Sequence, residues 1–344
     1  MGTYKVGVLT AEKTVEIREL ELRQPTGSQV LVKVDSCAIC TMEQRVYRGI
    51  MKPYPFAGGH EMAGIVAAVG DKVTGVKPGD KVAMRMLTAC GECYYCRSGH
   101  ENQCVVSFKA KVHEGLAGPG GFSEYMMVDA RSVFKMADDV DLSHAALTEP
   151  LACCVHSIGR GDIKFGDDVV VIGVGIMGAL HIQLARLRGA RVIVCELDKG
   201  RIEVARKMGA HVIIDSSKED PVARVKELTD NRGADAVICT VAIADVAAQS
   251  VAMAGKLGRV IFYSSIHPDK PIEVNPNRIH STEMIITGSV NPNVPDFLAA
   301  SRLISSGMVD VSELISETVP LGSLTHAFER AIDPATYRIV VKCG

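Results

Sequence analysis

Apolar and polar residues alternate in short runs along the first part of the chain. This period of two is typical of strands that bury one face, and no helical period persists for more than about two turns before residue 140. Pro25 and Gly27 mark one turn in the series, and Pro78-Gly79 marks another. The pattern predicts antiparallel β structure, with strands at residues 6–9, 15–17, 30–34, 63–70 and 81–84.

From residue 167 the pattern changes to short apolar runs that alternate with helical periods. Strands that alternate with crossover helices predict a doubly wound parallel sheet. The expected strands are 168–172, 191–196, 211–214, 236–239, 259–263 and 284–287, with helices at 179–187, 200–208, 220–229 and 245–254. A helix at 296–305 then leads to a terminal strand at 337–342, which we expect to rejoin the β-rich part.

Four cysteines lie close together in one stretch, at Cys90, Cys93, Cys96 and Cys104. Four thiolates at this spacing fit one tetrahedral metal ion, and a structural zinc site is closed by ligands of this kind. Four unrelated buried cysteines are one alternative, but the intervening glycines and charged residues indicate a loop. Two disulfides are the other alternative. We expect a structural zinc that holds a loop and has no open coordination position.

A second set of possible ligands is scattered through the first half and mixes sulfur, nitrogen and oxygen. It consists of Cys40, the adjacent pair His60-Glu61, and Glu149. Catalytic zinc sites have fewer thiolates than structural ones and keep a position for water or substrate. The alternative for His60 alone is a hydrogen-bonded polar residue at the start of a strand. The set predicts a catalytic zinc site.

A glycine-rich segment follows the first strand of the second half. It reads Gly173-Val174-Gly175-Ile176-Met177-Gly178, opens a helix, and is followed about 20 residues later by Glu196 at the end of the next strand. In this context the motif predicts a dinucleotide site, with the pyrophosphate at the helix N-terminus. Glu196 can accept hydrogen bonds from ribose hydroxyls and repels a 2′-phosphate, which favours NAD over NADP, although Lys199 and Arg201 lie nearby.

Composition narrows the function classes. The 344 residues are 47% hydrophobic and 23% charged, with a net charge of −2 and no basic cluster, which argues against nucleic acid or an anionic membrane as a partner. The first residues lack the apolar core of a signal peptide, and no apolar stretch is long enough to span a membrane. The odd number of cysteines, 11, with metal-type spacings predicts a reducing, cytoplasmic location.

Several motifs occur together in the order typical of one family. Gly59-His60-Glu61 with Gly64 and Gly70, the four-cysteine stretch, 78–82 and 121–125 resemble the landmarks of zinc-containing medium-chain alcohol and polyol dehydrogenases, including the sorbitol and threonine dehydrogenases. The resemblance covers essentially the whole chain. It implies an α/β protein with a GroES-like catalytic domain at 1–150, an NAD-binding Rossmann domain at 151–294, and a returning segment at 295–344 that completes the first domain.

The resemblance also implies roles for individual residues. Cys40 and His60 match the ligands of the catalytic zinc, and Glu61 and Glu149 match the two carboxylates that bind this metal or exchange with water. Cys153 and Cys154 lie near the point where alcohol dehydrogenases supply a second thiolate. The Glu149-Pro150 match favours Glu149 as the ligand instead.

The segment after Cys40 departs from the family pattern. The family usually has a serine or threonine at the start of its proton relay, and Met42 stands there instead. Thr41 is one residue away, and Glu43 takes the place of the carboxylate that orients the zinc-bound histidine. If Thr41 cannot serve, the proton leaves through zinc-bound water, Glu149 or a substrate hydroxyl. Arg45, Tyr47 and Lys109 either line the substrate pocket or face solvent.

The resemblance implies a zinc- and NAD-dependent oxidation of a secondary alcohol of a polyol, cyclitol or sugar derivative to the ketone. A threonine-type amino-acid dehydrogenase is the alternative within the same class. A nucleotide-binding relative that has lost catalysis is the alternative of a different kind, and the retained ligands argue against it. The family commonly pairs through the last sheet strand, here residues 284–287, so a homodimer or homotetramer is expected.

Overall fold

The computed structural model describes residues 2–87, 89–107 and 112–344, so Lys109 lies outside the described residues. The chain divides into two compact units. One unit consists of Met1–Ala152 with Asn293–Gly344, and the other of Cys153–Pro292. The family resemblance implies limits at 150/151 and 294/295, each two residues away. Within the described residues, no helix combines the length and apolar character that crossing a membrane requires.

The first unit is built on a mixed seven-stranded sheet. Its order is β16-β17-β3-β4-β5-β9, and β8 pairs with β3. All pairs are antiparallel except β16 and β17, which are parallel because helix α11 (Leu324–Ala331) makes the crossover between them. The strands are β3 (Gln29–Ala38), β4 (Glu61–Val69), β5 (Lys81–Met84), β8 (Tyr125–Asp129), β9 (Val133–Lys135), β16 (Ile315–Pro320) and β17 (Arg338–Lys342).

Smaller elements complete this unit. Strands β1 (Thr3–Ala11) and β2 (Thr14–Glu21) form an antiparallel hairpin, and the short strands β6 (Val112–His113) and β7 (Leu116–Ala117) pair with each other. The helices are α1 (Thr41–Tyr47), α2 (Tyr94–Arg97), α3 (Leu142–Ala145), α10 (Val294–Ser305) and α11. Helix α4 (Thr148–Arg160) contains the first boundary between the units.

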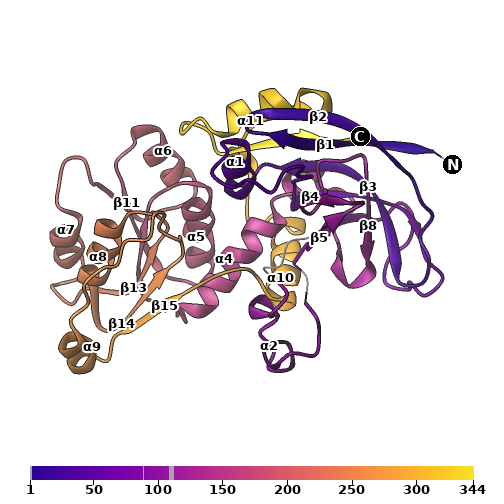
Figure 1. Cartoon of the computed structure of the whole chain (residues 1–344). Coiled ribbons are helices and arrows are strands. Elements are labelled where there is room, and N and C mark those ends of the chain that lie inside the picture. Colours follow the sequence, from indigo (N-terminus) through magenta and orange to yellow (C-terminus); the bar gives the residue numbers. More distant parts are fainter. Residues whose placement is uncertain (1, 88, 108–111) are drawn as a thin grey trace. The chain divides into compact units, whose positions relative to one another are not determined.

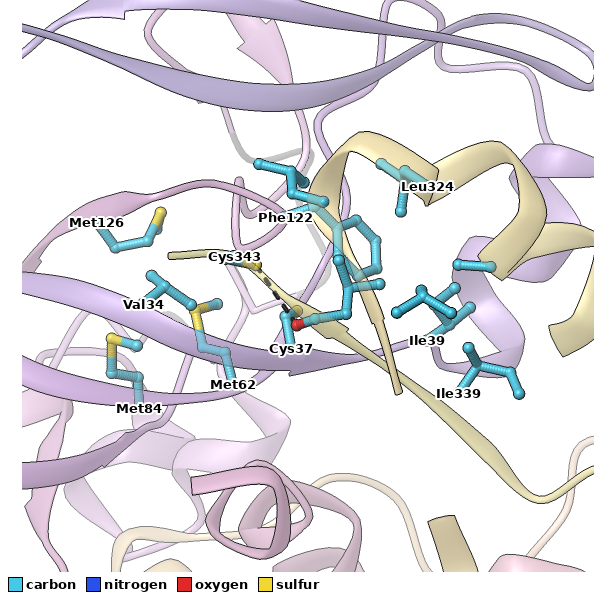
Figure 2. Packing of buried hydrophobic residues seen from close by; sticks show 14 of the residues in the cluster. Val34, Cys37, Ile39, Met62, Met84, Phe122, Met126, Leu324, Ile339 and Cys343 are labelled. Carbon is cyan, nitrogen blue, oxygen red and sulfur yellow. Dashed lines mark hydrogen bonds between the residues drawn. The ribbon is translucent and has the colours of Figure 1, made fainter. Parts of the chain in front are cut away.

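The core of the first unit lies between this sheet and the helices that pack on it. Figure 2 shows Phe122, Leu324 and Ile339, which come from three separate segments, in one cluster with side chains of β3 and β4. Tyr47 stacks on Phe328 with ring centroids 4.9 Å apart and an angle of 8° between the planes. Tyr47 is 2% exposed, so it is a core residue and neither faces solvent nor serves as a free pocket wall. Arg45 is partly exposed.

The second unit is a six-stranded parallel sheet of order β12-β11-β10-β13-β14-β15, which confirms the predicted doubly wound fold. Figure 1 shows helices α5 to α8 against these strands. The strands are β10 (Asp168–Ile172), β11 (Arg191–Glu196), β12 (Val212–Asp215), β13 (Ala234–Cys239), β14 (Ala254–Phe262) and β15 (Ile285–Gly288). The helices are α5 (Ile176–Leu187), α6 (Lys199–Lys207), α7 (Pro221–Leu228), α8 (Ala244–Met253) and α9 (Pro276–Thr282).

Several elements differ from the expected pattern, and three of them show why. Strand β14 begins five residues before its expected start, because its first part carries glycines and polar residues that hide the strand signal. Helix α4 was not anticipated, since Pro150 stands near its beginning. Proline is tolerated there because the first N–H groups of a helix have no partner within the helix. Helix α11 was missed as well, although it contributes the buried Leu324 and Phe328 to the core.

His181 is a buried polar residue of the second unit. It lies on α5, where Nδ1–H donates to the carbonyl oxygen of Met177 at 2.7 Å, and its ring meets Tyr263 edge to face at 4.9 Å. This bond leaves Nε2 as the nitrogen that would take up a second proton. Burial lowers the pKa of His181 to about 4, because a charged ring would lose its hydration.

We predict an acid-dependent loss of stability that His181 causes. The pKa of His181 is lower in the folded than in the unfolded chain. Its contribution to the free energy of unfolding is therefore complete at a pH above the unfolded pKa, and it is lost as the pH falls toward the folded pKa. Between about pH 7.5 and pH 5, this residue should remove about 2 kcal/mol of unfolding free energy. Urea unfolding of the wild type and His181→Gln at both pH values measures the difference. An equal loss in both proteins would contradict the prediction, since the variant keeps all other titrating groups.

Candidate functional site

The glycine-rich loop joins β10 to α5 in a conformation that depends on two of its glycines. Gly173 has φ +87°, in the left-handed region where a side chain is strained. A Cβ on Gly178 would lie 1.9 Å from the carbonyl oxygen of Gly173, so only glycine lets the helix approach the turn so closely. Gly175 is the N-cap of α5, and a Cβ there would meet nothing within 4 Å. The protein's own packing therefore does not require glycine at 175.

Glu196 at the end of β11 is tied to this loop. Its carboxylate accepts hydrogen bonds from the backbone N–H of Val174 at 2.7 Å, Leu197 at 2.7 Å and Asp198 at 3.0 Å. The residue is 7% exposed, so the three donors compensate for its burial. Arg201 lies in the first turn of α6, where its backbone N–H is capped by Asp198. Ile176, Met177 and Gly178 form the first turn of α5. The residues expected at the dinucleotide site therefore lie in three places: Gly173 and Gly175 in the loop, residues 176–178 in α5, and Glu196 and Arg201 in the strand and helix that follow.

The four cysteines of the short-spaced stretch come together in space. Sulfur atoms of Cys90, Cys93, Cys96 and Cys104 all lie within 4.8 Å of one another, and all four are free thiols. The sulfur–sulfur distances are 3.9 Å for Cys93–Cys104 and 3.6 Å for Cys90–Cys104. A tetrahedron with zinc–sulfur bonds of about 2.3 Å has edges of about 3.8 Å, so these thiols fit one tetrahedral zinc ion.

Backbone N–H groups favour thiolates in this cluster. The N–H of Cys93 donates to the sulfur of Cys90 at 3.3 Å, and the N–H of Cys90 donates to the sulfur of Cys104 at 3.2 Å. Donors from Cys96 and Val105 lower the pKa of Cys93 to about 6. The loop is also attached to its own unit, since the N–H of Asn102 donates to Oδ1 of Asn293 at 3.1 Å.

The mixed set of ligands is assembled from the ends of two neighbouring strands and the start of a helix. Ala38 of β3 is paired with Glu61 of β4, so Cys40, just beyond β3, and His60, just before β4, lie at the same end of the sheet. Cys40 and Glu43 each have a ligand atom within 4.8 Å of His60, and so do Glu61 and Glu149. His60 is thus the common member of both groups.

Glu43 orients the ring of His60 through a hydrogen bond. It has no exposed side-chain surface and accepts from Nδ1 of His60 at 2.7 Å, from the N–H of Gly59 at 3.0 Å and from the N–H of Cys40 at 3.2 Å. Burial raises the pKa of Glu43, but the histidine and the backbone donors outweigh it, so the pKa lies below its ordinary value. The same contact fixes the ring, so Nε2 is the histidine nitrogen available to a metal.

The other residues considered for this site lie differently. Thr41 is exposed at the first position of α1, and Met42 packs against the core of the first unit. Cys154 is buried in the second unit, with its sulfur 3.6 Å from the carbonyl oxygen of Met177. Among the described residues, none of the groups of possible metal ligands includes Cys153 or Cys154.

Arg338 is a part of the site that the sequence pattern did not reveal. Its Nε donates to Oε2 of Glu61 at 2.8 Å and one terminal nitrogen donates to Oε1 at 2.6 Å, while the same nitrogen lies 3.7 Å from the sulfur of Cys40. Burial lowers the pKa of Arg338, but Glu61 and Cys40 outweigh it and the pKa is raised. The signal in the sequence is weak, because Arg338 and Lys342 are cations at the two ends of the terminal strand and nothing in the pattern distinguishes them.

Comparison with known proteins agrees with this geometry. Residues 26–138 match the model of the alcohol dehydrogenase GroES-like domain, and residues 173–306 match that of the zinc-binding dehydrogenases. The sorbitol dehydrogenase of Bacillus subtilis is 32% identical over 95% of this chain and 93% of its own. The L-threonine 3-dehydrogenase of the same species is 31% identical over 91% and 90%.

A solved structure gives the same result. The zinc-binding dehydrogenase of Sinorhizobium meliloti 1021 bound to NADP superimposes with a TM-score of 0.90 at 27% identity, covering 99% of this chain and 100% of that one. The fold, the two clusters of metal-type ligands and the relatives lead to one conclusion. The chain belongs to the zinc-containing medium-chain dehydrogenases and is an alcohol/polyol dehydrogenase of that family.

Proposed function

We propose that this dehydrogenase uses NAD to oxidise a secondary alcohol group of a polyol, cyclitol or sugar derivative to the ketone. One observation carries the proposal: Cys40 and Glu149 both approach His60, on a chain whose other unit bears a glycine-rich dinucleotide loop. Sulfur, nitrogen and oxygen donors around one histidine support a catalytic zinc. The similarity to sorbitol dehydrogenase supports a polyol substrate.

Zinc bound to Cys40, His60 and Glu149 would supply a Lewis acid that favours deprotonation of an alcohol, and NAD would accept the hydride. The chain's residues provide the alignment. Glu43 keeps Nε2 of His60 directed at the metal, and the four cysteines bind a second, structural zinc that holds their loop. The N-terminus of α5 offers unpaired N–H groups to a pyrophosphate.

NAD is preferred over NADP in this proposal because Glu196 carries a negative charge beside the loop. The charge would repel a 2′-phosphate, whereas its oxygens can accept from ribose hydroxyls. The relative bound to NADP makes a direct comparison of the two cofactors necessary. Lys199 and Arg201 are the nearby cations that would favour the phosphate.

The proton released from the alcohol needs an acceptor. Met42 has no titratable group, and Thr41 is exposed at the start of α1. Glu149 is one of the proposed metal ligands, and both oxygens of Glu61 accept from Arg338. We therefore propose that the proton leaves through water or a substrate hydroxyl.

A threonine-type amino-acid dehydrogenase is the second candidate. The 31% identity with L-threonine 3-dehydrogenase is nearly the same as the identity with sorbitol dehydrogenase. The two candidates share the same metal site and dinucleotide loop, so only substrate turnover separates them.

Location and assembly complete the proposal. The free cysteines in metal-type groups support a reducing cytoplasm. Strand β15 is the outer strand of the parallel sheet, and its Ile285 is 55% exposed, which supports pairing of two copies through this edge. We propose a homodimer or a dimer of such dimers.

Turnover on a substrate panel tests the function. Zinc-loaded protein with NAD at about pH 9 should reduce the cofactor with polyols, cyclitols or sugar derivatives, because removal of the alcohol proton is easier at this pH. NADH absorbance is the measurement, with NADP and L-threonine in parallel. Cys40→Ser should abolish turnover. Turnover of L-threonine alone would establish the second candidate instead.

The glycine loop allows a test that does not depend on the substrate. Gly175→Ala should leave thermal unfolding unchanged, since the added Cβ meets nothing within 4 Å. It should weaken NAD binding on the order of tenfold, because the backbone has to approach the pyrophosphate there. Isothermal titration measures the affinity. Gly159→Ala, which also adds a Cβ in open space, is the control, and equal NAD affinity of both variants would argue against a dinucleotide at this loop.

Glu43 can be tested by metal content. Glu43→Ala leaves the ring of His60 unsupported and should weaken the metal site at Cys40 by about 10–100-fold, while the four-cysteine site keeps its zinc. After dialysis against a mild chelator, the variant should retain one zinc per chain and the wild type two. Glu317→Ala removes a carboxylate that pairs with a histidine at the surface, His326 at 2.9 Å, and should retain both. Retention of both metals by Glu43→Ala would refute the role.

A further inference from the structure

The strand order of the second unit fixes the direction in which a bound dinucleotide would run. The order β12-β11-β10-β13-β14-β15 reverses between β10 and β13, and in such sheets a dinucleotide lies across the carboxyl ends of the strands at this point. Glu196 at the end of β11, on one side of β10, is the proposed acceptor for the adenosine ribose. The nicotinamide half would therefore extend to the other side, over the ends of β13 and β14.

Tyr263 is the first residue after β14, so it lies at this end of the sheet. Its backbone N–H donates to the carbonyl oxygen of Cys239, the last residue of β13, at 3.1 Å. The hydroxyl of Ser264 donates to the carbonyl oxygen of Thr240 at 2.7 Å, which ties the next residue to the same neighbouring segment. Two contacts therefore hold the backbone here, while the side chain of Tyr263 is only partly buried.

The ring of Tyr263 packs against a histidine of α5. The ring centroids of Tyr263 and His181 are 4.9 Å apart and the planes meet at 78°, which is the edge-to-face arrangement that aromatic rings favour. His181 has no exposed surface, and its Nδ1–H donates to the carbonyl oxygen of Met177 at 2.7 Å. This bond ties the imidazole to the first turn of α5, so the orientation of the imidazole does not depend on Tyr263.

The second ring nitrogen of His181 shows what the imidazole contributes. Among the described residues, no donor reaches Nε2, which is buried. An apolar side chain of similar size would avoid the cost of a buried acceptor without a donor. The imidazole differs from such a side chain in being a flat ring whose orientation is fixed by a hydrogen bond. Because burial lowers the pKa of His181 to about 4, the ring is neutral near pH 7 and meets Tyr263 as an aromatic partner.

We propose that His181 is a positioning residue that holds the ring of Tyr263 as a wall of the site for the nicotinamide half of the cofactor. This inference rests on the proposed function, since it requires a dinucleotide at the carboxyl ends of these strands. Tyr263 contacts the cofactor, whereas His181 acts only through Tyr263. Neither residue is part of the glycine-rich motif at 173–178.

ADP-ribose is the probe that separates the two halves of the site, because it is NAD without the nicotinamide. Isothermal titration with NAD and with ADP-ribose is carried out on the wild type, His181→Leu and Tyr263→Leu. Both variants should weaken NAD binding by about three- to tenfold, whereas ADP-ribose binding should stay within about twofold of the wild type. Tyr263→Phe keeps the ring and should bind NAD as the wild type does.

The double variant His181→Leu/Tyr263→Leu tests whether His181 acts through Tyr263. Its NAD affinity should equal that of Tyr263→Leu alone, because the support has no effect once the ring is absent. Leu184→Ala is the matched control, since Leu184 is another buried side chain of α5. It should lower the thermal unfolding temperature and leave the ratio of the NAD and ADP-ribose affinities unchanged.

A purely structural role of His181 predicts a different pattern. Equal losses of NAD and ADP-ribose binding in His181→Leu, or additive losses of NAD binding in the double variant, would overturn the proposal. Tyr263→Leu provides a second measurement, which does not depend on the folding of the His181 variants. An NAD affinity of Tyr263→Leu equal to that of the wild type would also overturn the proposal.

The failure of this inference differs from failure of the proposed function. Wild-type protein that binds neither NAD nor ADP-ribose would refute the dinucleotide site and with it this inference. Wild-type protein that binds both ligands, combined with no effect of Tyr263→Leu on NAD binding, would refute only the roles of His181 and Tyr263.

Discussion

A charge that is removed from water must be paired, and this constraint shapes the metal-type site of the protein. Glu43 and Glu61 have no exposed side-chain surface, and an unpaired carboxylate in such a place would cost several kcal/mol. Each is compensated by a different partner. Glu43 accepts from His60 and two backbone N–H groups, and Glu61 accepts from Arg338. The two partners have different consequences. The carboxylate of Glu43 orients the ring of His60, whereas the guanidinium of Arg338 binds both oxygens of Glu61.

The position of β3 in the centre of the mixed sheet makes this arrangement possible. It lies between β4 and β17, so its end at Ala38 is flanked by the start of β4 on one side and the start of β17 on the other. Cys40 continues from that end and caps α1, which in turn carries Glu43. The possible ligands are therefore placed by strand register and by the starts of two helices, α1 for Cys40 and α4 for Glu149.

The conformation of the glycine-rich loop at residues 173–178 is determined by steric contact rather than by charge. Gly178 has no room for a Cβ against Gly173, so this contact sets how closely α5 follows β10. Gly175 has room for a side chain, so the packing of the chain does not require glycine there. The two glycines look alike in the motif, but only Gly178 is required by contacts within the chain.

Much of the fold could be read from the sequence, because the signals are local. Continuous apolar runs located the strands of the parallel sheet, mostly within two residues, since both faces of such strands are buried. The four cysteines could be grouped because short spacing brings them onto one loop. Helix α4 was not predicted, because Pro150 obscures the signal of its start. The contact between Arg338 and Glu61 was not predicted, because 277 residues separate them in the sequence. The pattern of one strand does not reveal which other strand pairs with it. The sequence by itself determined the elements, the glycine loop and the ligand types. Only the tertiary structure decided which carboxylate faces a cation, because that depends on which strands lie side by side.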